Sequence, residues 1–493
     1  MPSLEKHWDA IVVGSGLGGL SAAAELATAG KKVLVLEKHV FAGGYAHHFP
    51  RRLKGTRIIY DFDVALHQTG NLKPGRGTHE QFKRLGVLDR IRPIEFDTAY
   101  RTIGPDHDFV APAAADRLLK KFIEAYPHEK RGLTDIFHTM SRIDDNSEGI
   151  TPEALATFDI SLAEFVSQHG ITDERVIAIF CTLWGYVGSI PSRLSAFLFA
   201  QMWCSYHFGG CFYIEGGGQS LSDAYVSVIE ENGGKVRRRN EVASITTNSN
   251  GAVTGVETKK GLTYFAPQVI SNAALPNTFN GLLDNSELGT SERQRDRELP
   301  VATSIAQACI GMKGDAGKLG LADRGRFIEV SYDYESDWDA MVKGDYMNQP
   351  YMLGNHNLAD PGHHPKDRSI LHVTTLTDGR SWMNLEKKQY RERKRELTEF
   401  LLDRLEEVIP DARDRIEVCE VGTPHTMARY TSNPNGSIYG YASEVDSHTI
   451  HRPAPKTSVS GLYLAGAWTF PGPGFNGAIM SGLNTAREVL GDG

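Results

Sequence analysis

The stretch AIVVGSGLGGLSAAAELATAGKKVLVLEKHVFAGG, residues 10–44, decides the fold of this chain. Its first four residues, Ala10–Val13, are apolar and largely β-branched, which predicts a strand buried on both faces of a parallel sheet. A G-x-G-x-x-G motif follows, formed by Gly14, Gly16 and Gly19. These glycines permit a tight turn, a close approach to a pyrophosphate and close packing of the next helix. We predict that helix over residues 18–29, with Gly30 as its C-terminal stop.

A second apolar run, Val33–Leu36, ends at Glu37, which lies 23 positions after Gly14 (37 − 14). An acidic side chain at this place can bond the ribose hydroxyls of a dinucleotide and would repel a 2′-phosphate. A lone glycine pattern is a weak signal, but strand, glycine turn, helix, strand and acid in this order is a specific one. We therefore predict a Rossmann-like dinucleotide-binding unit near the N-terminus.

Size and composition narrow the class of protein. With 493 residues the chain exceeds one typical domain, so we expect two interleaved domains that share one crevice. Lys and Arg total 53 against 61 Asp and Glu, a net charge of −8 without a long basic run, so nucleic acid is not predicted as a partner. The five cysteines form no C-x-x-C pair, which argues against a disulfide framework or a zinc site and favours a reducing, cytoplasmic location.

The most apolar stretch is IAIFCTLWGYVGSIPSRLSAFLFAQMWCSYHF, residues 177–208. Pro191 and Arg193 interrupt it, so it predicts two short helices, and neither a run of 18 apolar residues nor an N-terminal signal segment is evident. Three interpretations stay open: ordinary core, a tunnel for a lipophilic substrate, and a surface that contacts a membrane peripherally.

The C-terminal segment GLYLAGAWTFPGPGFNGAIMSGLNTAREVL, residues 461–490, predicts the cofactor. We expect a strand at Leu462–Leu464, a glycine-rich path that lacks side chains, and a helix that begins near Ala478. A flat ring can lie on such a path, and the positive end of the helix would stabilise a reduced flavin, which is anionic on its pyrimidine side. A nicotinamide gains nothing comparable, so FAD is favoured over NAD.

The segments between these two ends alternate in type. Apolar and polar residues alternate around residues 60–66, which predicts a short strand pair close to the cofactor. Residues 81–205 are predicted to be mostly helical, and residues 212–274 return to an α/β pattern. Residues 385–408 predict a strongly charged helix solvated at the surface.

Several motifs together resemble the flavoprotein family of phytoene desaturases, carotenoid cis-trans isomerases and retinol saturases, part of the amine-oxidase-like group. They are the N-terminal glycine unit with Glu37, FDVALHQTG (62–70), HFGGCFYIEGGGQSL (207–221), TPHTMARYTSNPNGSIYG (423–440) and LYLAGAWTFPGPGFNGAIMSG (462–482). The chain departs from the family pattern at Ile214, where proline is usual, and at Gly466-Ala467, where Gly-Asp is commoner. The resemblance covers nearly the whole length.

The resemblance implies an α/β fold in which a Rossmann-like, glutathione-reductase-like FAD domain is interleaved with a mixed α+β substrate domain. We assign residues 1–75, 206–275 and 416–493 to the FAD domain, and 76–205 and 276–415 to the substrate domain. The flavin ring would face an apolar tunnel for a long isoprenoid or polyene. Burial stabilises such a chain by about 0.8 kcal/mol per CH₂, so it needs no charged anchor.

The predicted cofactor contacts come from both ends of the chain. They are Gly14, Ser15, Gly16, Leu17, Gly18, Gly19, Glu37, Lys38, Gly43, Gly44, Ala46, Val242, Gly466, Ala467, Gly477, Ala478 and Ile479. Hydride transfer to or from a flavin requires that the substrate is aligned with the flavin and that water is excluded, rather than that a nucleophile is present. The chain has no G-x-S-x-G nucleophile motif. Three candidates for acid–base work are His67, His207 and Tyr213, each equally compatible with a structural role. The spacing of His47, His48 and His67 matches no metal motif, so no metal is predicted.

Three functions remain open at this stage. The leading one is an FAD-dependent oxidoreductase that desaturates or saturates carbon–carbon bonds of a lipophilic polyene. The second is a redox-neutral polyene isomerase that uses reduced FAD, and the third is a flavin-containing lipid carrier without turnover. The substrate, the direction, the external electron donor or acceptor, and the oligomeric state are not predicted.

Overall fold

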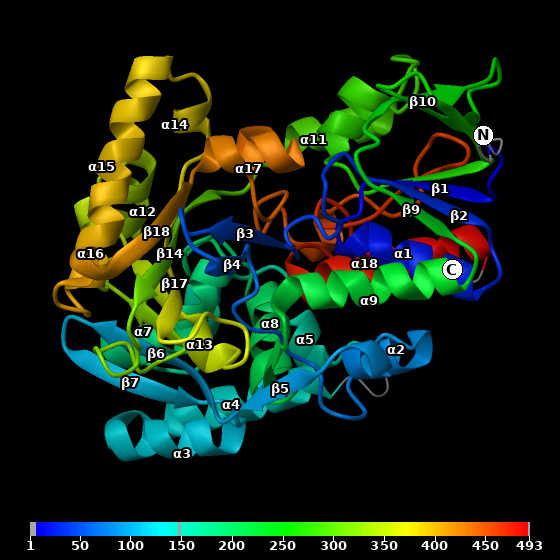
Figure 1. Cartoon of the computed structure of the whole chain (residues 1–493). Helices are drawn as coiled ribbons and strands as arrows, with labels where there is room; N and C mark the ends of the chain where they lie inside the picture. The colour runs from blue at the N-terminus through cyan, green and yellow to red at the C-terminus, as the bar shows by residue number, and fades with distance from the viewer. Residues whose placement is uncertain (1–5, 146–148, 492–493) are drawn as a thin grey trace.

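The computed structural model describes residues 6–145 and 149–491, which form two halves (Figure 1). The right half in Figure 1 contains a five-stranded parallel sheet and the helices that cover it. The left half contains a seven-stranded mixed sheet with the long helix α15 (Lys387–Glu406) beside it. The chain crosses between the halves repeatedly, because the parallel sheet takes strands from the beginning, the middle and the end of the sequence.

The parallel sheet has the strand order β19-β13-β1-β2-β9. Its strands are β1 (Ala10–Val13), β2 (Val33–Leu36), β9 (Lys235–Arg237), β13 (Gln268–Ser271) and β19 (Leu462–Leu464). Each of its pairings is parallel, with Val12 opposite both Val35 and Ile270. The predicted bounds of β1, β2 and β19 are confirmed.

Strand β1 is buried on both faces, as its apolar sequence predicts. Val12 packs toward the layer of α1 (Leu17–Thr28), α9 (Gly217–Glu231) and α18 (Gly474–Leu490). Ile11 and Val13 belong to a second core, shared with a three-stranded antiparallel sheet. That sheet consists of β10 (Val242–Thr247), β11 (Val253–Thr258) and β12 (Thr263–Phe265). A parallel sheet between a helical layer and a small β-sheet confirms the predicted Rossmann-like fold class.

The mixed sheet has the strand order β18-β14-β17-β16-β15-β6-β7. Its strands are β6 (Thr98–Gly104), β7 (His107–Pro112), β14 (Ser304–Lys313), β15 (Gly325–Ile328), β16 (Tyr351–Asn355), β17 (Arg368–Thr377) and β18 (Ile416–Gly422). Helix α15 buries Leu397, Leu401 and Leu405 in the core of this half. The predicted charged surface helix is present, and its few apolar residues recur on one face and pack inward, which the prediction did not include.

Helices form most of the region between residues 81 and 205. They include α3 (Ala115–Ala125), α4 (Lys130–Asp144), α6 (Leu162–Gln168), α7 (Glu174–Cys181) and α8 (Ala196–His207). Sequence reasoning missed three strands here, β5 (Pro93–Phe96), β6 and β7. Strand β7 does alternate between buried and exposed residues, but an alternation over only six residues is a weak signal in sequence. The predicted strand pair near residue 60 is present as β3 (His48–Arg52) with β4 (Ile59–Asp63).

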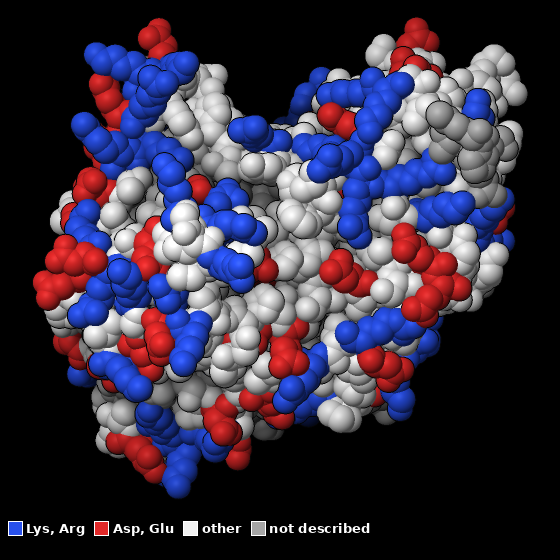
Figure 2. Space-filling view, in the orientation of Figure 1, with Lys and Arg blue, Asp and Glu red and all other residues white. Residues whose placement is uncertain are grey.

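The surface charge is unevenly distributed. In Figure 2, Lys and Arg side chains gather on both sides of the notch at the upper edge of the molecule, although the net charge of the chain is −8. Within residues 6–145 and 149–491, no helix is both long and apolar enough to cross a membrane.

Candidate active site

A single cavity of about 1120 Å³ reaches from the glycine turn of the parallel sheet to the mixed sheet. Gly14, Ser15 and Gly16 form part of its wall at one end. Aromatic and aliphatic side chains form another part, among them Trp184, Tyr206 and Phe327. The predicted cofactor site and the predicted lipophilic tunnel are therefore one continuous space.

The backbone of the turn after β1 is open to close approach by the phosphates of a ligand. Gly14 has φ of +93°, a left-handed conformation that strains other residues. Helix α1 begins at Leu17 with no side-chain cap and no acid in its first turn, so its first N–H groups stay available to an anion. A Cβ on Gly18 would lie 2.6 Å from the Cα of Gly466, so two backbones meet here without side chains. This cradle fits the pyrophosphate of a dinucleotide.

Glu37 is held in place at the end of β2. Its side chain lines the cavity, and the residue is 7% exposed. Oε2 accepts hydrogen bonds from the backbone N–H of Ser15 at 2.8 Å and from the Ser15 hydroxyl at 2.7 Å, and Oε1 accepts one from the backbone N–H of His39 at 2.7 Å. Each carboxylate oxygen can accept more than one hydrogen bond, so the group keeps capacity for a ribose hydroxyl.

The C-terminal helix starts earlier than its sequence suggested. Helix α18 begins at Gly474, whereas we predicted a start near Ala478. Gly474 has φ of +83° and follows Pro473 in extended conformation, so the chain turns into the helix there and Gly477 falls in its first turn. Asn476, in the same turn, donates from Nδ2 to the carbonyl oxygen of Gly70 at 3.2 Å. The start of α18 is thereby tied to the loop that follows β4.

The predicted cofactor residues gather at this cavity. All of them except Gly19 and Ile479 line it. Gly19 has a packing role, because a Cβ there would lie 2.3 Å from the carbonyl oxygen of Gly14. Ile479 is buried, and its carbonyl oxygen accepts a hydrogen bond from the Ser21 hydroxyl at 3.0 Å, which joins α18 to α1.

The apolar stretch 177–208 contributes both to the core and to the wall of the cavity. Phe180, Phe199 and Trp203 are buried in the core of the helical region. Leu198 and Met202, on the same helix α8 as Trp203, line the cavity. The stretch is thus both core and cavity wall.

The three acid–base candidates lie in different places. His67 lines the cavity, and burial lowers its pKa to about 4. His207 does not line it; its Nδ1 donates to the carbonyl oxygen of Ala113 at 3.0 Å, and its ring packs on Trp203. Tyr213 lies on β8 (Cys211–Ile214) outside the cavity, with its hydroxyl 3.5 Å from Nδ1 of His356.

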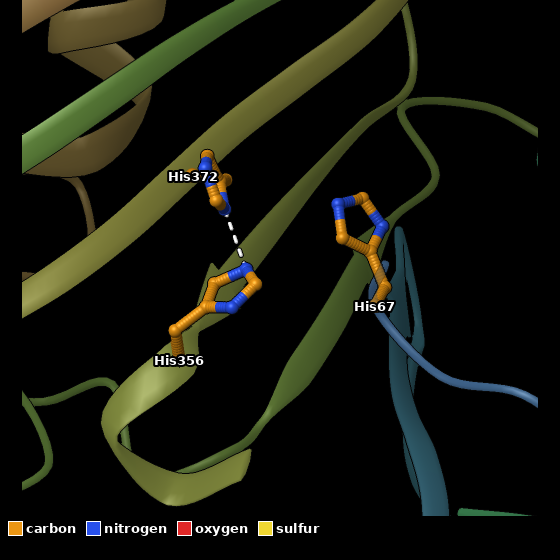
Figure 3. A group of neighbouring side chains, drawn as sticks. All are labelled: His67, His356 and His372. Atoms are coloured by element: carbon orange, nitrogen blue, oxygen red, sulfur yellow. Dashed lines mark hydrogen bonds between the residues drawn. The ribbon is translucent and has the colours of Figure 1, made fainter. Parts of the chain in front are cut away.

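Two groups of side chains at the site were missed. Glu329 and Asp337 are buried and line the cavity, and burial, reinforced by Asp337, raises the pKa of Glu329 to about 8. His356 and His372 lie close to His67 (Figure 3). No local spacing could reveal either group. Glu329 follows β15 and Asp337 lies on α12 (Tyr334–Lys343), whereas the three histidines come from the loop after β4, from α13 (His356–Ala359) and from β17.

Comparison with known proteins identifies the family. The chain matches the family described as flavin containing amine oxidoreductase over residues 17–490. The chain belongs to this family. Its glycine cradle and the fixed Glu37 fit the flavin cofactor that the family description names, so the prediction of FAD is confirmed.

Curated relatives support the narrower resemblance. Prolycopene isomerase 1, chloroplastic, of an Oncidium hybrid cultivar is 27% identical over 518 residues, which cover 99% of this chain and 84% of the relative. All-trans-retinol 13,14-reductase of Danio rerio is 27% identical over 542 residues, covering 98% of this chain and 86% of the relative. The predicted resemblance to carotenoid isomerases and retinol saturases is therefore confirmed.

Solved structures support the fold. An oxidoreductase from Methanosarcina mazei has a TM-score of 0.68 at 18% identity and covers 97% of this chain and 99% of its own. Putrescine oxidase with bound putrescine has a TM-score of 0.63 at 14% identity, covering 98% of this chain and 99% of its own. Both likenesses concern the fold, which agrees with the arrangement of sheets described above.

Proposed function

We propose that this protein is an FAD-dependent enzyme that reduces or oxidises a carbon–carbon unit of a long, lipophilic polyene. The observation that carries the proposal is the single cavity that joins the glycine cradle to apolar walls. Bound FAD would supply a hydride to, or accept one from, one carbon of that unit. The named curated relatives, which act on prolycopene and on all-trans-retinol by their names, support a substrate of this class.

The residues of the chain have separate tasks in this proposal. Glu37 and the N-terminus of α1 hold the dinucleotide end of the cofactor. Side chains such as Met202 and Phe327 exclude water and bury the polyene. The second hydrogen must move as a proton, and His67 is the acid–base candidate that borders the cavity.

An anaerobic experiment tests the proposal. The purified protein is reduced, a conjugated polyene such as all-trans-retinol is added, and the flavin spectrum and the product mass are followed. Flavin reoxidation together with a gain of two hydrogens supports the reductase. A flavin that stays reduced with the polyene unchanged contradicts catalysis and favours a carrier.

A second candidate is redox-neutral isomerisation of a polyene. The relatedness to prolycopene isomerases over 99% of the chain favours it. The same experiment separates the two, because an isomerase leaves the product mass and the flavin reduction state unchanged while the geometry of the polyene changes.

We also propose that the substrate enters from a membrane surface. Ile150, Ile450 and Phe470 border the cavity and are exposed by 63%, 48% and 37%. Apolar side chains around an opening can lie in the interface of a bilayer. Sedimentation with phosphatidylcholine vesicles should be weakened in Ile450→Ser and retained in Met347→Ser, which changes an exposed apolar residue that does not border the cavity.

A further inference from the structure

Three histidines from distant parts of the chain meet beside the cavity. His67 lies in the loop after β4, His356 at the start of α13 (His356–Ala359), and His372 in the middle of β17. One ring nitrogen of each lies within 4.8 Å of a ring nitrogen of the other two. In Figure 3 a nitrogen of His67 faces the pair that His356 and His372 form.

The mixed sheet positions two of these rings. Strands β16 and β17 are antiparallel, with Gly354 opposite His372. His356 follows the end of β16, and its ring therefore lies close to the His372 ring. Nε2 of His356 is 2.6 Å from Nδ1 of His372. The other nitrogen of His356, Nδ1, lies 3.5 Å from the Tyr213 hydroxyl. A hydrogen bond donated by Nδ1 to that hydroxyl leaves the lone pair on Nε2, as in histidines that bind metals.

A further nitrogen in this group is buried without a partner. Nε2 of His67 makes no hydrogen bond with any described residue. Buried polar atoms are ordinarily paired, so this atom beside the other two rings needs an explanation. Burial lowers the pKa of all three imidazoles, which favours the neutral form that has a lone pair for a metal.

We propose that His67, His356 and His372 bind a divalent transition metal of the zinc type. Zinc–nitrogen bonds of about 2.0–2.1 Å in a tetrahedron separate the nitrogens by about 3.3 Å. The observed separations run from 2.6 Å to at most 4.8 Å, so each differs from that value by about 1.5 Å or less. Imidazole ligands suit zinc, copper, iron and nickel rather than magnesium or calcium.

The position of His67 indicates which side of the proposed metal site faces the cavity. His67 borders the cavity, whereas His356 and His372 do not, so the fourth coordination position would face the cavity. Three protein ligands with one open position are typical of catalytic rather than structural zinc. With a metal bound, His67 would be a ligand rather than an acid–base group, and a water or a substrate oxygen could occupy the open position. Metal binding itself does not depend on the proposed reaction.

A second group, His48, Asp61 and His363, provides a contrast. Its side chains are 24%, 23% and 43% exposed, and Asp61 Oδ2 lies 2.6 Å from His48 Nδ1 and 3.5 Å from His363 Nε2. These contacts already pair the carboxylate with both rings, and the histidines lower the pKa of Asp61 to about 2 against the effect of its burial. We therefore interpret this group as partly exposed ion pairs.

The test measures zinc bound by the full-length, FAD-loaded protein. The protein is stripped with a chelator, dialysed against zinc chloride and analysed for metal per chain, and the affinity is measured by competition with a coloured chelator. We expect one zinc per chain in the wild type, and an affinity weakened at least about 100-fold in His67→Gln and in His372→Gln. Retained flavin shows that each variant is folded.

Two control variants locate the zinc. His207→Gln changes another buried histidine whose Nε2 lacks a partner, and Asp61→Asn disrupts the second group. Both should bind zinc like the wild type. The proposal is overturned if the wild type binds no zinc, if His67→Gln and His372→Gln bind it unchanged, or if only Asp61→Asn loses it.

Discussion

The Glu37 carboxylate accepts hydrogen bonds from both the backbone N–H and the hydroxyl of Ser15, at 2.8 and 2.7 Å. These bonds join the end of β2 to the glycine turn after β1. The acid is thus oriented by the same turn that forms the glycine cradle, as the proposed contact with a ribose requires. Preorganisation of this kind increases affinity because less freedom is lost on binding.

Glu37→Ala should weaken FAD binding about 10- to 100-fold, since a hydrogen bond to a charged group contributes about 1.5–3 kcal/mol. The measurement is a titration of the flavin-free protein with FAD, followed by flavin fluorescence. Glu231→Ala is the control, because Glu231 is exposed and pairs with Arg90 at the surface. Equal affinities in the Glu37→Ala and Glu231→Ala proteins would contradict the assignment of Glu37.

Gly18→Ala should destabilise the protein and release its flavin. A Cβ at this position would lie 2.6 Å from Cα and 2.7 Å from the backbone nitrogen of Gly466, and neither backbone can turn aside like a flexible side chain. Forced overpacking costs about 1–3 kcal/mol. Urea unfolding and flavin content of the purified protein measure the effect.

Gly77→Ala is the matched control for Gly18→Ala. Gly77 is the first residue of α2 (Gly77–Leu85), and nothing lies within 4 Å of a Cβ built there. Alanine should leave stability unchanged or raise it by up to about 1 kcal/mol. If Gly18→Ala behaved in the same way, the close approach of α1 and the loop after β19 would not be a requirement of the fold.

The two ends of the chain could be predicted because their signals are local. The bounds of β1 and β19 follow from short apolar runs next to glycines, and the glycines that line the cavity after β1 follow from a motif with fixed spacing. The start of α18 was misplaced by four residues, because a glycine at its first position resembles a loop in sequence. The pairing of His372 with His356 and the burial of Glu329 depend on how strands align in the mixed sheet, which no local pattern encodes.

Met202→Trp should impair turnover of long polyenes without loss of flavin. Met202 lines the cavity from α8, and a larger ring there would displace part of the bound chain. Losing the burial of two CH₂ groups costs about 1.6 kcal/mol, which lowers kcat/KM about tenfold. Met347→Trp, at a residue that is 62% exposed and does not line the cavity, is the control. Equal kcat/KM values for both variants would argue against a tunnel along α8.

Glu329 makes the stability of the protein depend on pH. Burial, reinforced by the neighbouring Asp337, raises its pKa to about 8 from an ordinary value of 4.5, and one carboxyl oxygen, Oε2, has no described partner. Between these two pH values the folded protein holds a proton that the unfolded chain has released. The free energy of unfolding therefore falls as the pH rises from about 4.5 to about 8, and the full loss is present above that window.

Glu329→Gln should remove this dependence, because the amide stays neutral at every pH. We expect the variant to exceed the wild type in Tm by more at about pH 8.5 than at about pH 5, where the wild-type carboxyl is itself protonated in the folded state. Thermal unfolding of both proteins in the two buffers measures the difference. Glu124→Gln, at a side chain that is 65% exposed on α3, should shift Tm little and equally at both pH values. A Tm difference for Glu329→Gln that does not grow with pH would show that Glu329 is ionised at the cavity wall, and the cavity would then contain a buried negative charge rather than a neutral acid facing the substrate.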